Sequence, residues 1–455
     1  MTIAAVATPP GEGAIAIVRV SGPGARGVAR RVLRRAGGAP VPLSPRSVVR
    51  AFAVDPRNER TLDEVLVLWM PGPASYTRED VLEIQCHGGH AAARAVLRAC
   101  LDAGARPARP GEFTLRAFLN GRLDLVQAEA VLDVVRARSA EALRVHEELL
   151  SGHLSREVGA WQESLTRHLA LLEAHLDFPD EEDVGELDSG ALIAGLEAVT
   201  RQMEEKLAGY AWGRALREGF TAALVGSPNT GKSSLLNRML GEDRAIVTEA
   251  PGTTRDLVEG WTQAEGVPLR IVDTAGLREP GDPAEREGVR RARGAMEQAH
   301  CVLLVCDGSR PLTPDEVLRA RELRGRPGLV PVLNKVDLGR VPREDLARAC
   351  GREPVEVSAL TGEGVQALLD LLGRMAQDGR GPGSEAPLTR ERHRELVAEA
   401  TGCLREAVEV LRSGAYPEVA ASQVHAARRC LAELLGWGAP EDVLEAIFSQ
   451  FCIGK

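Results

Sequence analysis

The segment from Gly226 to Ser233, which reads Gly-Ser-Pro-Asn-Thr-Gly-Lys-Ser, constrains the fold of this chain more than any other. An apolar run at 220–225 precedes it, and a run with helical periodicity at 234–240 follows it. In such a strand–loop–helix context, glycines let the loop backbone direct its N–H groups at phosphate oxygens. Lys232 can reach the terminal phosphates, and the Ser233 hydroxyl can bind magnesium. A chance glycine-rich turn does not explain this context, so we predict a phosphate-binding loop.

Three further motifs follow the phosphate loop, each directly after a short apolar run. Asp273–Gly276 provides a carboxylate for magnesium and a backbone N–H that can sense the γ-phosphate. Asn334–Asp337 ends in a carboxylate that can accept hydrogen bonds from N1–H and the exocyclic amine of guanine, two donors that adenine does not present in this arrangement. Ser358–Leu360 can offer its backbone to the base carbonyl. The ordered set predicts a domain that binds and hydrolyses GTP.

Between the first two motifs, Gly252–Asp256 supplies hydroxyl groups in a switch-like loop, and we expect Thr254 to be a magnesium ligand. Leu277 follows Asp273–Gly276, where many switch GTPases carry a glutamine that orients the attacking water. An apolar side chain cannot orient water. Catalysis must therefore depend on a residue farther along, such as Glu285, and on an additional positive charge near the phosphates.

The whole chain predicts a multidomain protein of mixed α/β and α class, because 455 residues exceed a single hydrophobic core. Alternating β-like and helix-like runs over 1–118 predict an α+β domain. Regular β/α alternation over 218–378 predicts a Ras-like domain with a mainly parallel sheet. Helical periodicity over 119–217 resumes over 379–455. We therefore predict a helical bundle that is interrupted by the inserted GTPase domain.

Composition limits the compartment and the partners. No apolar run approaches the roughly 18 residues of a membrane-spanning helix, and no cleavable apolar segment starts the chain, so we expect a cytoplasmic protein without a membrane partner. The eight cysteines form no Cys-x-x-Cys pair, which argues against disulfides and structural zinc. The net charge of -9 argues against a broadly basic surface, so RNA recognition needs a local patch or a partner. We interpret Arg30, Arg31, Arg34 and Arg35, on a predicted helix, as a solvated basic face.

Together with segments near both ends, these motifs resemble the bacterial tRNA-modification GTPases called MnmE or TrmE, over essentially the whole chain. The resemblance is carried by the GTPase motifs and by Ala7–Gly11, Pro71–Pro73, Glu79–Glu83, His87–Gly89, Arg109–Phe113, Ala117–Asn120 and the terminal Phe451–Lys455. An α+β domain, an interrupted helical bundle and this C-terminal pentapeptide together are far more specific than the GTPase motifs alone.

The resemblance implies a function. The family's N-terminal domain binds a tetrahydrofolate derivative and mediates a homodimer. With a flavin-dependent partner called MnmG or GidA, which carries FAD, the family forms a heterotetramer or larger complex. The complex adds an aminomethyl or carboxymethylaminomethyl group to the 5-position of the wobble uridine in certain tRNAs, and folate supplies the one-carbon unit. GTP hydrolysis in the family depends on potassium and on transient contact between two GTPase domains.

The motifs and the resemblance together assign residues to these roles. The expected GTP-binding residues are Asn229, Thr230, Gly231, Lys232, Ser233, Ser234, Thr248, Thr253, Thr254, Asp273, Thr274, Ala275, Gly276, Asn334, Lys335, Asp337, Ser358, Ala359 and Leu360. The expected magnesium ligands are Ser233 and Thr254, and the expected potassium ligands are Asn229, Thr248, Ala250 and Thr253. The expected catalytic residues are Asn229, Lys232 and Glu285, with potassium acting as an arginine finger would.

The folate-binding positions of the family correspond to Arg19, Glu83, Arg122 and Lys455. Arg122 stands where the family pattern has lysine, so a cation is kept while its geometry changes. Cys452 matches the family's near-terminal cysteine, for which packing and a catalytic role both stay open.

Two other functions stay open from sequence. A ribosome-assembly switch GTPase would share the GTPase domain, act by binding and lack a flavoprotein partner. A folate-dependent methyl-transfer module would leave the GTPase only regulatory. Calorimetry with a folate analogue on residues 1–118 separates these, because a switch GTPase gives no heat of binding.

Overall fold

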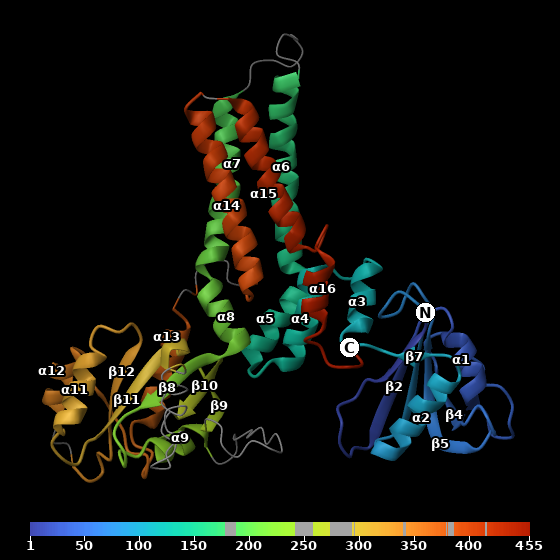
Figure 1. Ribbon diagram of the computed structural model, residues 1–455, viewed down its shortest axis with the longest axis horizontal. Coiled ribbons are helices and arrows are strands. Elements are labelled where there is room, and N and C mark those ends of the chain that lie inside the picture. The colour runs from blue at the N-terminus through green and yellow to red at the C-terminus, as the bar shows by residue number, and fades with distance from the viewer. Residues whose placement is uncertain are drawn as a thin grey trace. The chain divides into compact units, whose positions relative to one another are not determined.

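The computed structural model describes residues 1–177, 188–241, 258–273, 294, 296–339, 343–378, 380, 386–414 and 416–455 (Figure 1). The chain forms two compact units. Unit 1 comprises Met1–Leu132, Leu149–Ala170 and Val424–Lys455, and unit 2 comprises Asp133–Glu148 and Leu171–Gln423. Each unit is thus assembled from segments that lie far apart in the sequence.

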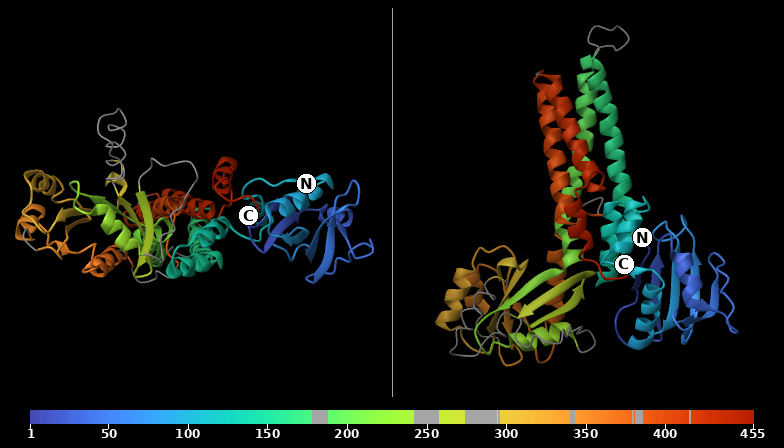
Figure 2. Two further views of the ribbon diagram at one scale, coloured as in Figure 1. Left: turned by 90° about the horizontal axis from the view of Figure 1, so that it is seen from below. Right: turned by 45° about the vertical axis from the view of Figure 1, so that its right-hand side comes forward.

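A seven-stranded sheet forms the N-terminal part of unit 1, in the order β3-β4-β5-β6-β2-β1-β7. Its strands are β1 (Ile3–Val6), β2 (Ile15–Ser21), β3 (Leu33–Arg34), β4 (Val48–Val54), β5 (Thr61–Met70), β6 (Val81–His87) and β7 (Arg106–Pro107). Neighbouring strands are antiparallel except β1 and β7. Alternate residues of the central strands pack under α1 (Ala25–Val32) and α2 (His90–Asp102), which cover one face of the sheet (Figure 2). This is the period-two pattern of a sheet with one covered face.

α3 (Glu112–Leu119) belongs to the opposite face of this sheet. Its core there consists of Ile3, Ala5, Ala108 and Phe113. α3 begins after Gly111, whose φ of 66° is left-handed, and a Cβ on Gly111 would lie 2.5 Å from the Phe448 carbonyl oxygen. Only glycine therefore lets the C-terminal segment approach so closely. The backbone N–H of Phe113 donates to the carbonyl oxygen of Lys455 at 3.2 Å, which anchors the chain end on this domain.

Helical segments from both ends of the chain form the rest of unit 1. They belong to α4 (Leu125–Arg136), α6 (His153–Asp177), α15 (Pro417–Leu434) and α16 (Glu441–Phe448). Their shared core contains Leu125, Ala128, Leu132, Ile447, Phe448 and Phe451. The ring of Phe118, from α3, lies 6.3 Å from the ring of Phe448. Residues near the C-terminus thus complete a core that the first third of the chain begins.

Unit 2 contains a six-stranded sheet in the order β13-β12-β11-β8-β10-β9. Its strands are β8 (Phe220–Val225), β9 (Val258–Ala264), β10 (Val267–Asp273), β11 (Cys301–Asp307), β12 (Leu329–Asn334) and β13 (Val355–Glu356). Only the edge strand β9 runs antiparallel to its neighbour. The associated helices are α9 (Lys232–Leu240), α11 (Pro314–Glu322), α12 (Arg343–Cys350) and α13 (Val365–Ala376). Every residue of β11 and β12 is buried, as expected for parallel strands covered on both faces.

The helices of unit 2 come from before and after this sheet in the sequence. They are α5 (Ala140–Leu150), α7 (Ser189–Ala208), α8 (Tyr210–Glu218) and α14 (Glu391–Arg412), and α7 lies along α14 (Figure 1). Asp133 accepts a hydrogen bond from Arg217 at 3.4 Å, just before β8, and from Arg390 at 2.8 Å, just after the GTPase segment. The predicted fold class, with a helical domain interrupted by a parallel-sheet domain, is confirmed. No helix in the described ranges is long and apolar enough to cross a membrane.

Candidate functional site

The predicted phosphate loop connects the end of β8 to the first turn of α9. A Cβ on Gly226 would lie 2.2 Å from the carbonyl oxygen of Val305 in β11. Gly231 has a φ of 85°, and a Cβ there would lie 2.3 Å from Nδ2 of Asn334. The loop therefore needs glycine at both positions, because two neighbouring strands hold it at close range. The unpaired N–H groups at the start of α9 make this a site for anions.

Lys232 places its charge inside this loop. Its side chain is mostly buried, and its Nζ donates to the carbonyl oxygens of Gly226 at 3.1 Å and Ser227 at 2.7 Å. The Thr230 hydroxyl donates to the same Ser227 carbonyl at 3.0 Å. A flexible ammonium at the N-terminus of a helix adds to the positive end of the helix dipole. The loop thus concentrates positive charge where phosphates would bind.

Ser233 and Asp273 form the second part of the nucleotide site. The Ser233 hydroxyl, on the exposed first turn of α9, donates to Oδ2 of Asp273 at 2.7 Å, and Asp273 lies buried at the end of β10. A hydroxyl and a carboxylate are oxygen donors of the kind that magnesium prefers. The chemistry of this pair therefore fits the magnesium site predicted at Ser233. Ser234 follows on the same exposed turn of α9.

Asn334 links the base motifs to the phosphate loop. Its Nδ2 donates to the Thr230 carbonyl at 2.9 Å, and its Oδ1 accepts from the backbone N–H of Ala359 at 3.0 Å. The side chain is almost fully buried. Since one amide bridges two loops, Asn334 holds the ends of β8 and β12 in register with the segment after β13.

Lys335 and Asp307 form an ion pair that sequence reasoning missed. Lys335 Nζ lies 2.7 Å from Asp307 Oδ2 and also donates to the Asn229 carbonyl at 2.7 Å. Burial by itself raises the pKa of Asp307, but hydrogen bonds from Lys335 and from Ser309 outweigh it and hold that pKa below its ordinary value. Asp307 ends β11, between the strands that carry the phosphate loop and the base motif. Its position at the end of an apolar run was a signal that could have found it.

The residues predicted to recognise guanine also meet. The Ser358 hydroxyl donates to Oδ1 of Asp337 at 2.5 Å, while Asp337 itself is exposed. Arg238 Nε donates to the Ala359 carbonyl at 2.9 Å, which ties this segment to α9. Leu360 is exposed. An accessible carboxylate is thus fixed at the edge of the sheet by a buried hydroxyl.

Several predicted residues lie outside the described residues. They are Thr248, Ala250, Thr253, Thr254, Thr274, Ala275, Gly276 and Glu285, together with Leu277. Of the predicted nucleotide site, the described residues are the phosphate loop, Asp273 and the base motifs, and these lie close together.

A second cluster of predicted residues lies in the N-terminal part of unit 1. Arg19 Nε donates to Oε1 of Glu83 at 2.8 Å across neighbouring strands, and Arg19 also donates to the Gly454 carbonyl at 3.3 Å. The neighbouring Lys455 is half-buried. Its pKa is lowered, first by burial and then by the nearby positive charge of Arg19. The predicted folate positions at 19, 83 and 455 thus share one region.

Tyr76 joins Arg122 to this cluster and was not predicted. The guanidinium of Arg19 lies 5.6 Å from the centre of the Tyr76 ring, and that of Arg122 lies 4.7 Å from it. Arg122 also donates to the Tyr76 carbonyl at 2.8 Å. The Tyr76 hydroxyl is 2.9 Å from that of Thr114, and burial raises the pKa of the phenol. A loop tyrosine carries no sequence pattern of its own, so only the fold reveals that it lies between two predicted cations.

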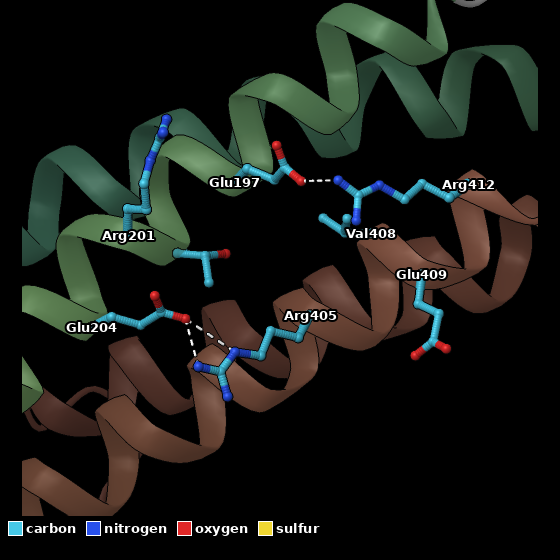
Figure 3. Close-up of a pocket in the computed structure, with 8 residues that line it drawn as sticks. Glu197, Arg201, Glu204, Arg405, Val408, Glu409 and Arg412 are labelled. Carbon is cyan, nitrogen blue, oxygen red and sulfur yellow. Dashed lines mark hydrogen bonds and ion pairs between the residues drawn. The ribbon is translucent and has the colours of Figure 1, made fainter.

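A third feature, an open groove of about 560 Å³ between α7 and α14, contains none of the predicted residues (Figure 3). Arg405 pairs with Glu204 at 2.6 Å, and Arg412 pairs with Glu197. These exposed ion pairs link the two helices. Pairs of this kind contribute little to stability.

These features define a P-loop GTPase: a mainly parallel sheet, a phosphate loop at the carboxyl end of strand β8, and the Asn334–Asp337 motif beside that loop. A family model described as the MnmE helical domain matches residues 125–452, and one described as the GTP-binding protein TrmE N-terminus matches residues 2–122. The chain belongs to the MnmE family of tRNA modification GTPases. It is thus a GTP hydrolase of tRNA modification, and GTP and magnesium are the nucleotide and the cation that this class of enzyme binds.

Relatives are similar to this chain over its whole length. The tRNA modification GTPase MnmE of Heliobacterium modesticaldum is 46% identical over 464 residues, covering 100% of this chain and 99% of that protein. The one from Geobacter metallireducens is 44% identical over 459 residues, with the same coverage. Among solved structures, Era in complex with MgGDPNP and nucleotides of 16S ribosomal RNA is 27% identical, covers 34% of this chain and 56% of that one, and has a TM-score of 0.29. The predicted family is confirmed.

Proposed function

We propose that the protein is a potassium-stimulated GTPase that acts with a flavin-dependent partner of the MnmG or GidA type. The pair would add an aminomethyl or carboxymethylaminomethyl group to the 5-position of the wobble uridine of certain tRNAs in the cytoplasm. A tetrahydrofolate derivative would supply the one-carbon unit, and FAD would belong to the partner. The observation that carries this proposal is that a single chain combines the nucleotide site of unit 2 with the Arg19–Glu83–Lys455 cluster of unit 1.

In the nucleotide site, we assign the residues to roles that suit their chemistry. The Gly226–Ser233 backbone and Lys232 would hold the β- and γ-phosphates, and Asp337 would select guanine. Ser233 and Thr254 would hold magnesium, which neutralises charge that develops on the phosphates, and Asp273 would orient the metal's water. Asn334 and Lys335 keep these loops in place through the hydrogen bonds described above.

Asn229 is our proposed handle for potassium. Its φ of 63° is left-handed, and its carbonyl oxygen is held by Lys335 at 2.7 Å, so the residue is fixed on the exposed side of the loop. Its side-chain oxygen, with oxygens from Thr248, Ala250 and Thr253, would bind the cation that replaces an arginine finger. Glu285 would orient the attacking water. In many other GTPases a glutamine at the position of Leu277 has this role, which the apolar Leu277 cannot perform.

The N-terminal cluster suits a folate derivative by its charges and hydrogen-bonding groups. Arg19, Arg122 and Lys455 provide three cations for the carboxylates of a glutamate tail, and Glu83 can accept from N–H groups of a pterin ring. Tyr76 holds two of these cations against its ring. The residues of this chain would thereby bind and orient the one-carbon donor.

The exposed part of the sheet face opposite α1 and α2, beside the core that α3 covers, is our proposed homodimer interface. Ile15, Val48 and Leu66 are 55%, 58% and 42% exposed, on the face opposite α1 and α2. Exposed apolar side chains that are grouped on a sheet face are typical of a surface that packs against another molecule. A second copy of the chain would bury it about a two-fold axis.

Two measurements test this function. GTP hydrolysis should be several times faster in potassium than in sodium at equal ionic strength, and Asn229→Ala should remove most of this difference. Nucleoside analysis of tRNA from a deletion strain should show wobble uridines that lack the group. Hydrolysis indifferent to the cation, together with fully modified uridines, would overturn the proposal. Co-sedimentation with ribosomal particles would instead favour the assembly GTPase.

A further inference from the structure

The outer surface of α1 and α2 carries five exposed arginines. We name it the arginine face, and it consists of Arg26, Arg30, Arg31, Arg94 and Arg98. The two helices lie side by side on the N-terminal sheet, with their apolar residues in the core beneath (Figure 1). Within each helix, two of the arginines lie one turn apart. The arginines therefore lie on one side of the sheet, on two neighbouring helices.

This surface differs in part from the solvated helix face predicted from sequence. α1 ends at Val32, so Arg34 lies in β3 and Arg35 follows it. Arg34 is bound by Glu59 at 2.9 Å. In place of these two, the neighbouring helix supplies Arg94 and Arg98, which are more than 60 positions away in the sequence. Only the packing of α1 beside α2 brings them together.

Negative charge is nearly absent from these two helices. α1 has no carboxylate and α2 has only Asp102, which is paired both with Arg57 at 3.2 Å and with Arg98 at 3.1 Å. Residues 1–118 contain 16 arginines and 10 carboxylates, a net charge of +6, whereas the whole chain carries -9. The arginine face is thus the local positive patch of an acidic protein.

Part of this charge does not serve the fold. Arg31 donates to the Ala103 carbonyl at 3.2 Å, Arg98 pairs with Asp102, and the Arg26 guanidinium lies 6.0 Å from the centre of the Trp69 ring. Among the described residues, no hydrogen bond or ion pair holds the guanidinium of Arg30 or of Arg94. Like charges one turn apart, as at Arg26 and Arg30 or at Arg94 and Arg98, destabilise a helix. A charge pattern that opposes folding and lies exposed points to a binding partner that carries negative charge.

The residue types specify this partner. Guanidinium groups bind phosphate oxygens with two parallel hydrogen bonds. Neither α1 nor α2 contains phenylalanine, tyrosine or tryptophan, and their one histidine, His90, stands at the first position of α2. The five arginines therefore have none of these three aromatic side chains between them on which an unpaired base can stack. Phosphate contacts without stacking suit a base-paired RNA, whose bases are enclosed.

We propose that the arginine face binds the phosphate backbone of a base-paired arm of tRNA, irrespective of base sequence. This inference rests on the proposed role in wobble-uridine modification and adds the surface that holds the tRNA body while the anticodon is modified elsewhere. The arginine face lies on the opposite side of the sheet from Ile15, Val48 and Leu66. A homodimer formed through those residues therefore leaves it accessible.

The test compares tRNA binding by the full-length protein and by the double variant Arg30→Glu and Arg94→Glu. Fluorescence anisotropy with an unmodified tRNA transcript should show affinity lowered at least about tenfold, because two phosphate contacts become repulsive. The dependence of affinity on salt should become shallower by about one unit of log–log slope for each lost contact. The loss of affinity should be equal for tRNAs of different sequence. It should also be equal for a plain RNA duplex of about 16 base pairs.

The matched control is the double variant Arg321→Glu and Arg348→Glu, with the same charge change on exposed helices α11 and α12 of unit 2. It should bind tRNA within about twofold of the wild type, apart from the general effect of net charge. Arg30→Lys with Arg94→Lys should keep most of the affinity. GTP hydrolysis measured on every sample shows that each variant is folded.

Four outcomes would overturn the inference: tRNA binding unchanged in the arginine-face variant, equal loss in the control, no tRNA binding by the wild type at 50 mM salt, or preference for single-stranded RNA over duplex. Loss of binding to phosphatidylserine vesicles without loss of tRNA binding would also overturn it, in favour of a lipid surface. Failure of the proposed function is recognised separately, because fully modified uridines in a deletion strain refute that function whatever the arginine face binds.

Discussion

At the scale of single residues, the nucleotide site depends on ion pairs between strand ends. Asp307 illustrates this, because it fixes Lys335, which in turn holds the phosphate loop at Asn229. Asp337 illustrates the opposite situation, an exposed carboxylate held ready for a ligand by Ser358. The first residue supports the site, and the second is proposed to contact the base.

We expect Asp307→Asn to weaken GDP and GTP binding by about tenfold or more, because a charged hydrogen bond contributes roughly 1.5–3 kcal/mol. The loss should be similar for both nucleotides, since Lys335 steadies the loop and does not touch the γ-phosphate. Equilibrium binding of fluorescent nucleotides measures it. Asp315→Asn, an exposed carboxylate on α11, serves as control, and unchanged affinity in Asp307→Asn would refute the role.

For Asp337→Asn, the expected change is in selectivity. An amide can donate to the 2-carbonyl of xanthine but cannot accept both guanine donors, so GTP affinity should fall at least about tenfold while xanthosine triphosphate gains. Competition binding with the two triphosphates measures the ratio. An unaltered preference for GTP would contradict the assignment, and Asp345→Asn on α12 provides the comparison.

At the scale of elements, the junction between β7 and α3 depends on Glu112. Its carboxylate is bound by Arg106, by Arg116 at 3.1 Å and by the backbone N–H of Arg109 at 2.9 Å. Burial alone raises the pKa of Glu112, but these hydrogen bonds outweigh it and lower that pKa to about 2. The ion cluster thus favours the charged carboxylate at the start of α3, where the helix dipole also favours it.

The stability that Glu112 contributes should therefore depend on pH. Its pKa is near 4.3 in an unfolded chain, so the contribution is complete above about pH 5 and is lost as pH falls toward 2. We expect Glu112→Gln to lower the melting temperature at pH 7 and to differ less and less from the wild type below pH 4. Calorimetry across this range measures the difference. A constant difference at all pH values would show that charge is not the cause.

At the scale of the whole molecule, the proposed dimer depends on the exposed apolar residues of the sheet face opposite α1 and α2. We expect Leu66→Glu to produce monomers at micromolar concentration, because a carboxylate in a packed apolar interface loses its hydration without a partner. Leu66 is exposed and its cross-strand neighbour Arg50 already pairs with Glu64, so the new carboxylate stays hydrated in the monomer. Sedimentation velocity measures the oligomeric state. Leu318→Glu, at an exposed leucine on α11, is the control, and a Leu66→Glu dimer would place the interface elsewhere.

The confirmed parts of the prediction are those that local pattern determines. Period-two and helical runs gave the α+β, helical and parallel-sheet parts, and the order of the GTPase motifs gave the class of enzyme. The phosphate loop needs glycine at Gly226 and Gly231 because of backbone geometry, and such needs are visible in a short segment. The motif at Asn334–Asp337 is likewise a short contiguous segment, so it can be recognised before the structure is known.

Contacts between distant residues were decided only by the tertiary structure. Arg19 and Gly454 are 435 positions apart, and Lys335 lies 106 positions from Asn229. Tyr76 and the placement of Arg94 and Arg30 on one side of the sheet carry no local signal, because both depend on neighbours that are distant in the sequence. Hydrogen bonds, ion pairs and surface charge depend on the distance between residues in space. Sequence patterns indicate only the local backbone conformation and which face of a helix or strand is buried.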